Sequence, residues 1–152
     1  MGTINVSIAE ESIRRGIRAG IIMACGACFV EFFQSYIALS FFNILSTNPG
    51  AERTIILTCI PIFLVIGCYY LFKKNTHVPA PKTKASHVIG FAKGIMVTTL
   101  NLIAIPYYVF LGGYLHSAGM ISLAPEFVAA FSVGVVAGTF LVFFIYAQLG
   151  QY

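Results

Sequence analysis

The chain has 152 residues and a formal net charge of +4; 59% of its residues are hydrophobic and 9% are charged, and its mean hydropathy is +0.89. Because an ordinary soluble domain has about 25% charged residues, this composition excludes a soluble globule and favours a membrane protein. The small basic excess is better explained by membrane topology than by binding to nucleic acid.

The first segment, residues 1–19, is too polar to cross a membrane. Ile4, Ile8, Ile13 and Ile17 recur among its charged residues. This spacing predicts an amphipathic helix at the membrane interface that runs into the first span.

Four apolar segments follow, and each is long enough for a span of about 20 residues. They are residues 20–45, 54–72, 89–115 and 127–149. We therefore predict an all-α polytopic bundle of about four transmembrane helices, forming one integral membrane domain over residues 1–152. The basic stretch 73–86 contains two prolines, which indicates a linker between two pairs of spans.

Basic residues gather before the first span and in the 73–86 linker, whereas the other two connections together hold one arginine, Arg53. The positive-inside rule places the basic segments in the cytoplasm. With four spans, both termini of the chain are then cytoplasmic.

Glu31 is the only charged residue between Arg18 and Glu52. On a helix it lies about 20 Å beyond Arg18, near the middle of a bilayer, where a charge costs about 2.5 kcal/mol or more unless it faces a cavity or a partner. The residues that share its helical face are small or polar: Gly20, Ala24, Ala27, Cys28, Gln34, Ser35 and Ala38. We predict a substrate or proton-coupling site at Glu31 and Gln34; the alternative is a carboxyl that only packs two helices together.

The third span carries Thr98, Asn101 and Tyr108 on one face. Pro106 cannot donate to the carbonyl of Leu102, so we expect a bend that frees a backbone acceptor inside the membrane. Bent helices of this kind line substrate sites in transporters. We predict that the three polar residues belong to the site and that Pro106 is a hinge; the alternative is an ordinary proline kink.

Two pairs of glycines have the spacing that allows close helix contact, Gly90-x-x-x-Gly94 and Gly134-x-x-x-Gly138. We predict a packing role for both pairs. Lys93 is expected to extend toward the inner interface.

Cys25 and Cys28 form a C-x-x-C pair, which is found in redox dithiols and in metal sites. The pair lies inside a predicted helix, where a thiolate is neither stabilised nor reachable, so small apolar filler is the better interpretation. The histidines show no ligand spacing, and the chain has no phosphate-binding loop. We predict no metal, no cofactor and no enzymatic activity.

Several segments resemble the lysine exporter (LysE/RhtB) family in their order and spacing. They are Gly2–Asn5, Arg15–Gly20, Cys25–Glu31, Phe91–Gly94, Leu100-Asn101 and Gly134–Thr139. In that family a basic, glycine-bearing turn leads into a helix with an acid, followed later by an N-P-K element and a glycine-rich helix. This chain has Leu102-Ile103 in place of the Pro-Lys.

The resemblance implies a bacterial inner-membrane transporter that exports amino acids or similar small polar metabolites along an ion gradient, with the proton as candidate coupling ion. In this hypothesis Glu31 exchanges a proton or pairs with a substrate ammonium, and Asn101 and Thr98 bond its polar groups. The lipid bilayer and the small substrate are the implied partners.

The family typically has about six spans, so we expect its first and last helices to lie outside residues 1–152. A four-span variant that completes its pathway as a homo-oligomer is the alternative. Three other functions stay open at this point: a small proton-coupled drug exporter, a four-helix thiol oxidoreductase that uses Cys25 and Cys28, and a non-transporting assembly subunit.

Overall fold

The computed structural model describes residues 2–47, 87–101 and 103–151, with single positions between residues 50 and 72. Within this part the protein is helical and contains no strand, which confirms the all-α prediction. The helices are α1 (Thr3–Arg15), α2 (Ile17–Ser46), α4 (His87–Thr99), α5 (Ala104–Ser117) and α6 (Pro125–Leu149). The predicted linker 73–86 and most of the predicted span 54–72 lie outside the described residues.

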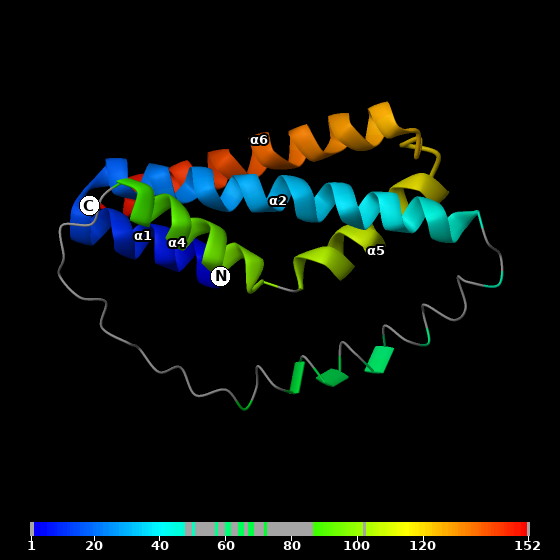
Figure 1. Cartoon of the computed structure of the whole chain (residues 1–152), viewed down its shortest axis with the longest axis horizontal. Coiled ribbons are helices and arrows are strands. Elements are labelled where there is room, and N and C mark those ends of the chain that lie inside the picture. The colour runs from blue at the N-terminus through cyan, green and yellow to red at the C-terminus, as the bar shows by residue number, and fades with distance from the viewer. Residues whose placement is uncertain are drawn as a thin grey trace.

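Two of these helices, α2 and α6, are long and apolar enough to cross a membrane. They coincide with the spans predicted at 20–45 and 127–149. The helices α4 and α5 pass the same test only together, as a pair bent by 63°, which has the form of a broken span or of a re-entrant loop. In Figure 1, α6 and the α4–α5 pair run along α2, and together they form a helical membrane bundle.

The chain reverses direction at Gly16, between α1 and α2. Gly16 has a φ of 88°, a backbone conformation that glycine adopts without steric cost. Its N–H donates to the carbonyl of Ser12 and its carbonyl accepts from Ala19, both at 2.9 Å. One glycine thus ends α1 and starts α2, and α1 folds back along α2 (Figure 1).

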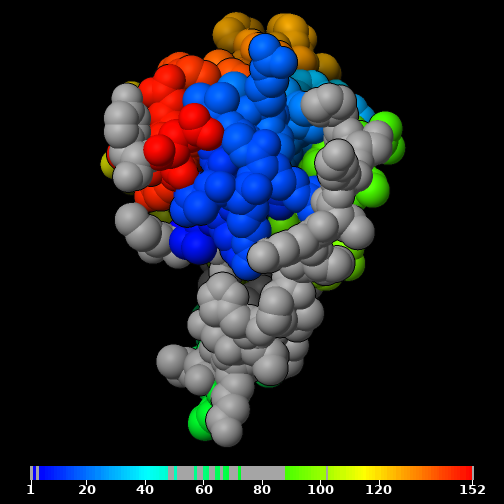
Figure 2. All heavy atoms as spheres, turned by 90° about the vertical axis from the view of Figure 1, so that its left-hand side faces the viewer, coloured from blue at the N-terminus to red at the C-terminus, as the bar shows by residue number. Residues whose placement is uncertain are grey.

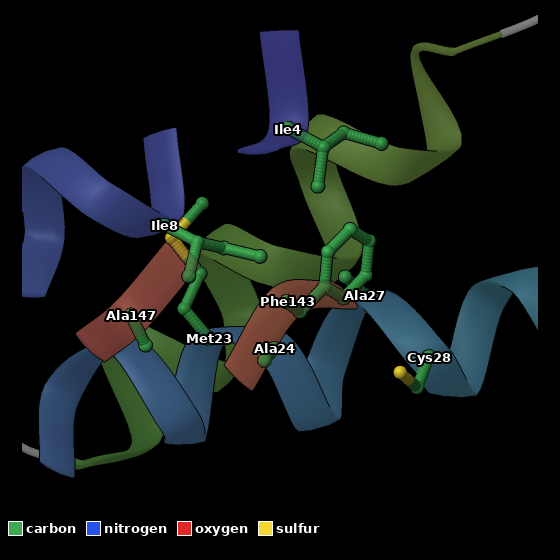
Figure 3. Packing of buried hydrophobic residues seen from close by; sticks show 8 residues of the cluster. All are labelled: Ile4, Ile8, Met23, Ala24, Ala27, Cys28, Phe143 and Ala147. Carbon is green, nitrogen blue, oxygen red and sulfur yellow. The ribbon is translucent and has the colours of Figure 1, made fainter. Parts of the chain in front are cut away.

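The predicted N-terminal helix is therefore present, but it does not run on into the first span. Two of the isoleucines expected at the membrane interface pack instead into the bundle, where Ile4 is 4% and Ile8 0% exposed, whereas Ile13 stays 68% exposed. Figure 3 shows the cluster that they join: Ile4, Ile8, Met23, Ala24, Ala27, Cys28, Phe143 and Ala147. The small side chains on α2 let α1 and α6 approach closely and bury the isoleucines.

The crossing of α2 and α4 depends on one glycine from each helix. A Cβ on Gly26 would overlap the carbonyl of Phe91, and a Cβ on Gly94 would overlap the carbonyl of Met23. Gly90 lies in looser contact, since a Cβ there would be 3.6 Å from the Ile22 side chain. At this crossing the two backbones touch directly.

At the end that holds the α1–α2 turn, α1 is fastened to both α4 and α6. Lys93 Nζ of α4 lies 2.6 Å from Glu11 Oε2, and Arg15 Nη1 lies 3.1 Å from Glu11 Oε1. Ser12 Oγ donates to the carbonyl of Ala147 on α6 at 2.5 Å. Viewed from this end, α1 and the start of α2 lie between the C-terminal part of α6 and α4 (Figure 2). Lys93, in the middle of α4, therefore has a specific partner in Glu11.

Candidate functional site

Glu31 lies on the face of α2 that turns toward α6. Its residue is 7% exposed, and its carboxyl lies beside the side chain of Thr139, whose hydroxyl donates to the carbonyl of Val135. One carboxyl oxygen of Glu31, Oε2, is buried and has no hydrogen-bond partner. Within the described residues Glu31 belongs to no ion pair. A buried acid with one free oxygen can bind a proton or a cationic group.

The whole face predicted around Glu31 is buried, which confirms the periodicity argument for this helix. Its members are Gly20, Ala24, Ala27, Cys28, Gln34, Ser35 and Ala38. On the opposite side Phe29 is 54% and Phe33 47% exposed. The acid thus faces the bundle, and the aromatic rings face outward to where lipid would lie.

Gln34 and Thr98 bring α2 and α4 together next to Glu31. Gln34 Nε2 donates to the backbone carbonyl of Thr98 at 3.2 Å. Gln34 Oε1 and Thr98 Oγ1 are buried and have no hydrogen-bond partner. One acceptor and one hydroxyl are therefore free to bond a polar molecule at this point.

The break between α4 and α5 lies at Asn101, which is partly exposed. The Asn101 N–H donates to Thr98 at 3.0 Å, and its carbonyl accepts from Ala104 at 3.2 Å. Pro106 belongs to the first turn of α5, where a missing N–H leaves no helical bond unmade. The bend was predicted at Pro106, and the structure has it in the turn before that residue. Whether Pro106 acts as a hinge stays a prediction.

Tyr108 of α5 is 8% exposed and packs in a second cluster with Ala38, Leu39 and Ala104, about two turns beyond Glu31 along α2. Of the sequence-predicted residues, Gln34 and Thr98 are thus brought together, while Asn101 is linked to them only by its backbone bond to Thr98. Lys93 and Arg15 form ion pairs with Glu11 and not with Glu31.

Thr139 was missed as a partner of Glu31, because its position in a glycine-rich motif suggested packing alone. A signal for it exists in the sequence. Ser132 and Thr139 lie seven residues apart on α6, and therefore on the same helical face. Ser132 is fully buried and bonds the carbonyl of Val128 at 3.0 Å. A polar stripe at this spacing on an apolar helix marks the face that turns inward.

The model of one protein family, the LysE type translocators, matches residues 1–152, the whole chain. The chain belongs to the LysE type translocator family. No curated protein and no solved structure matches it. The resemblance inferred from the sequence is thereby confirmed, and the chain is a membrane transport protein.

The C-x-x-C pair of this LysE-type chain does not form a disulfide. Cys25 is exposed and Cys28 is buried, and both are free thiols. The Cys28 sulfur lies 4.0 Å from the carbonyl of Val136 on α6, as a small packing side chain would. No group of metal-ligating side chains occurs in the described ranges. The family match and this geometry give no support to the thiol oxidoreductase alternative.

The glycines of α6 differ from those of α4. No described atom lies within 4 Å of a Cβ built on Gly134 or Gly138, and both residues are exposed. Among the parts of the LysE-type chain that the structure covers, these two glycines have no helix packed on them. Their packing role stays a prediction.

Proposed function

We propose that this chain is a secondary transporter that exports amino acids or similar small polar metabolites. The observation that carries the proposal is Glu31, a carboxyl buried in an apolar bundle with one oxygen left without a partner. An acid in this position is costly. The cost is offset when the acid takes up a proton or a substrate ammonium.

The neighbouring groups supply the rest of a binding site. Gln34 Oε1 and Thr98 Oγ1 are free to accept or donate hydrogen bonds, and Asn101 lies where α4 ends. The Thr98 carbonyl at this break already accepts from Gln34 Nε2 and from the Asn101 N–H, so the side-chain groups are the ones available to a bound ammonium. The proposed role of Tyr108 is to close the site from α5.

The proposed cycle alternates access between the two sides of the bacterial inner membrane. A bent pair such as α4–α5 can move as two segments around the break, with Pro106 as the proposed hinge. Proton binding at Glu31 would compete with substrate binding, which couples export to the proton gradient. The positive-inside rule supports a cytoplasmic α1–α2 turn and C-terminus.

The test is counterflow and efflux of radiolabelled amino acids from proteoliposomes that hold the Glu31→Gln variant. We expect transport to fall at least about tenfold and to lose its response to an imposed pH gradient, since the amide cannot exchange a proton. Glu10→Gln is the matched control, because Glu10 pairs with Arg14 on the surface. Transport by Glu31→Gln equal to that of the control would remove Glu31 from the mechanism.

A further inference from the structure

The helix α1 lies between α4 and α6 at the end of the bundle that holds the α1–α2 turn. In the described part of the chain, α4 and α6 each pack extensively on α2 and at most marginally on each other. The helix α1 packs on α2 and α6 and also reaches α4, and Figure 2 shows it from this end. One short helix thus connects α4 to α6.

Beneath α1, packed side chains fill the bundle between the turn and Glu31. Along α2, Met23 and Ala27 lie between the turn and Glu31, and both belong to the cluster that Ile4 and Ile8 of α1 complete (Figure 3). The C-terminal part of α6 contributes to the same cluster. A solute that moves from this end to Glu31 along the α2–α6 interface would therefore have to displace the isoleucines of α1.

The interface of α2 with α4 is closed at the same end by the backbone itself. A Cβ on Gly26 would overlap the carbonyl of Phe91, and a Cβ on Gly94 would overlap the carbonyl of Met23. Two backbones in direct contact leave no room for a solute, and they separate only when a whole long helix moves. Among the described elements that close this end, α1 is the short one whose movement would open a way to Glu31.

The connection of α1 to α2 is suited to such a movement. Gly16 is the only residue between the two helices, its φ is 88°, and no described atom lies within 4 Å of a Cβ built on it. Because glycine has the widest range of backbone angles, a change of φ and ψ at this one position would swing α1 as a unit. Hinges in proteins consist of a few loop or helix-terminal residues of this kind.

Two polar contacts join α1 to its neighbours. The α4 link is the ion pair of Glu11 with Lys93, 2.6 Å long, and the α6 link is the hydrogen bond from Ser12 Oγ to the carbonyl of Ala147. Lipid tails are as apolar as the side chains that α1 buries, so separating apolar faces costs little within a bilayer. The two links are therefore the specific contacts that must break when α1 moves.

We propose that α1 is a gate at the α1–α2 end of the bundle, the cytoplasmic end in the orientation proposed above. It turns about Gly16, both links break, and Ile4 and Ile8 leave the cluster that separates Glu31 from the cytoplasm. The structure has this gate closed. The inference rests on the proposed export function and names the element that opens one side of the pathway.

The first test locks the gate through α4. With the four native cysteines replaced by alanine, Glu11→Cys/Lys93→Cys is joined by a short bifunctional methanethiosulfonate, and mass spectrometry measures the linked fraction. We expect the linked protein in proteoliposomes to export radiolabelled amino acids at least about tenfold more slowly than the unlinked protein, because alternating access requires the closed end to open. Dithiothreitol is expected to restore export. Glu10→Cys/Arg14→Cys is the matched control, since this surface pair lies within α1 and its link cannot hold α1 against another helix.

The second test locks the gate through α6 and leaves the ion pair intact. Ser12→Cys/Ala147→Cys brings two thiols close together, since the Cβ atoms of Ser12 and Ala147 lie 3.1 and 3.2 Å from one Cβ position built on Gly20. We expect the linked protein to lose export as in the first test, and each single-cysteine variant treated with the same reagent to export normally. A loss in both linked proteins assigns the movement to α1, because the second link does not involve α4. If the first double variant does not fold without its buried ion pair, the second decides alone.

The outcomes separate the gate from the proposed function. Normal export by either linked protein would overturn the gate, and the export function would survive, since the unlinked protein still exports. A wild-type protein that exports no amino acid would overturn the proposed function and, with it, the pathway that the gate serves.

Discussion

At the scale of single residues, a substitution of Thr98 is expected to change transport without changing the stability of the protein. Its hydroxyl is fully buried and has no partner, and valine has nearly the same shape. We expect Thr98→Val to change the free energy of unfolding by less than about 1 kcal/mol, because no bond within the protein is lost. Efflux is expected to fall several-fold if the hydroxyl bonds substrate.

Thermal unfolding in detergent and efflux from proteoliposomes check this expectation on the same preparation. Thr99→Val is the control, since Thr99 is exposed and bonds the carbonyl of Ile95 at 2.8 Å. A clear loss of stability in Thr98→Val would mean that its hydroxyl stabilises the fold, and normal efflux would exclude it from the site.

The sequence identifies the inward residues of α2 but not their partners. Helical periodicity alone places Glu31 and Gln34 on a small-residue face, and both are buried as expected. Thr139 could not be assigned to Glu31 in the same way, because that contact depends on the rotation of α6 relative to α2. Such a rotation depends on contacts between helices, for example of Phe143 on α6 with the cluster that contains Ile4 of α1, which no local pattern reveals.

At the scale of the helices, alanine is predicted to act oppositely on Gly26 at the α2–α4 crossing and on Gly138, which lies on an open face of α6. Gly26→Ala is expected to lower the free energy of unfolding by about 1–3 kcal/mol, because its Cβ would meet the backbone of Phe91 and push the helices apart. Gly138→Ala has open space and is expected to be neutral or to stabilise by up to about 1 kcal/mol through helix propensity. Unfolding of both variants in mixed micelles measures the difference. A destabilised Gly138→Ala would instead indicate that a helix packs on that face.

The attachment of α1 predicts a second contrast, between buried and surface ion pairs. The Glu11 side chain is 3% exposed where it meets Lys93, so Lys93→Met would leave a buried carboxylate with Arg15 alone. We expect a loss of about 3 kcal/mol in unfolding free energy. The control, Glu10→Gln, breaks a pair that is 42% and 35% exposed and is expected to cost less than about 0.5 kcal/mol. Equal losses in the two variants would show that the Glu11–Lys93 pair does not fasten α1.

The position of the helix break shows why a bend is easier to predict than a boundary. Pro106 forbids a hydrogen bond to the carbonyl of Leu102, and this constraint is met either by a kinked continuous helix or by a new helix that starts just before the proline. The structure has the second arrangement, with α5 starting at Ala104. Both arrangements place the same apolar residues in the membrane, so hydropathy does not separate them.

At the scale of the whole molecule, α1 and α4 both pack on α2. The helix α1 packs there through Ile4 and Ile8, and α4 ends at Thr99, where the Thr98 carbonyl accepts from Gln34. Hydropathy predicted the spans that hold Glu31 and Thr98 but treated α1 as an interfacial segment, because its charged residues dominate its composition. Those charges gather at the α1–α2 turn, while Ile4 and Ile8 of α1 enter the core.

The two ends of the helical bundle differ in charge, and this difference predicts how the protein is oriented in the membrane. The C-terminal end of α6 lies at the same end of the bundle as the α1–α2 turn, with Gly150 against the carbonyl of Ala9 (Figure 1), and the α5–α6 connection lies at the opposite end. Because the turn carries Arg14, Arg15 and Arg18, the positive-inside rule places it in the cytoplasm. In a cysteine-free background, Ala118→Cys is expected to react with a membrane-impermeant maleimide in intact cells. Gln151→Cys is expected to react only after permeabilisation. The reverse pattern would invert the orientation, and equal labelling of both positions in intact cells would contradict their location at opposite ends of a bundle that spans the membrane.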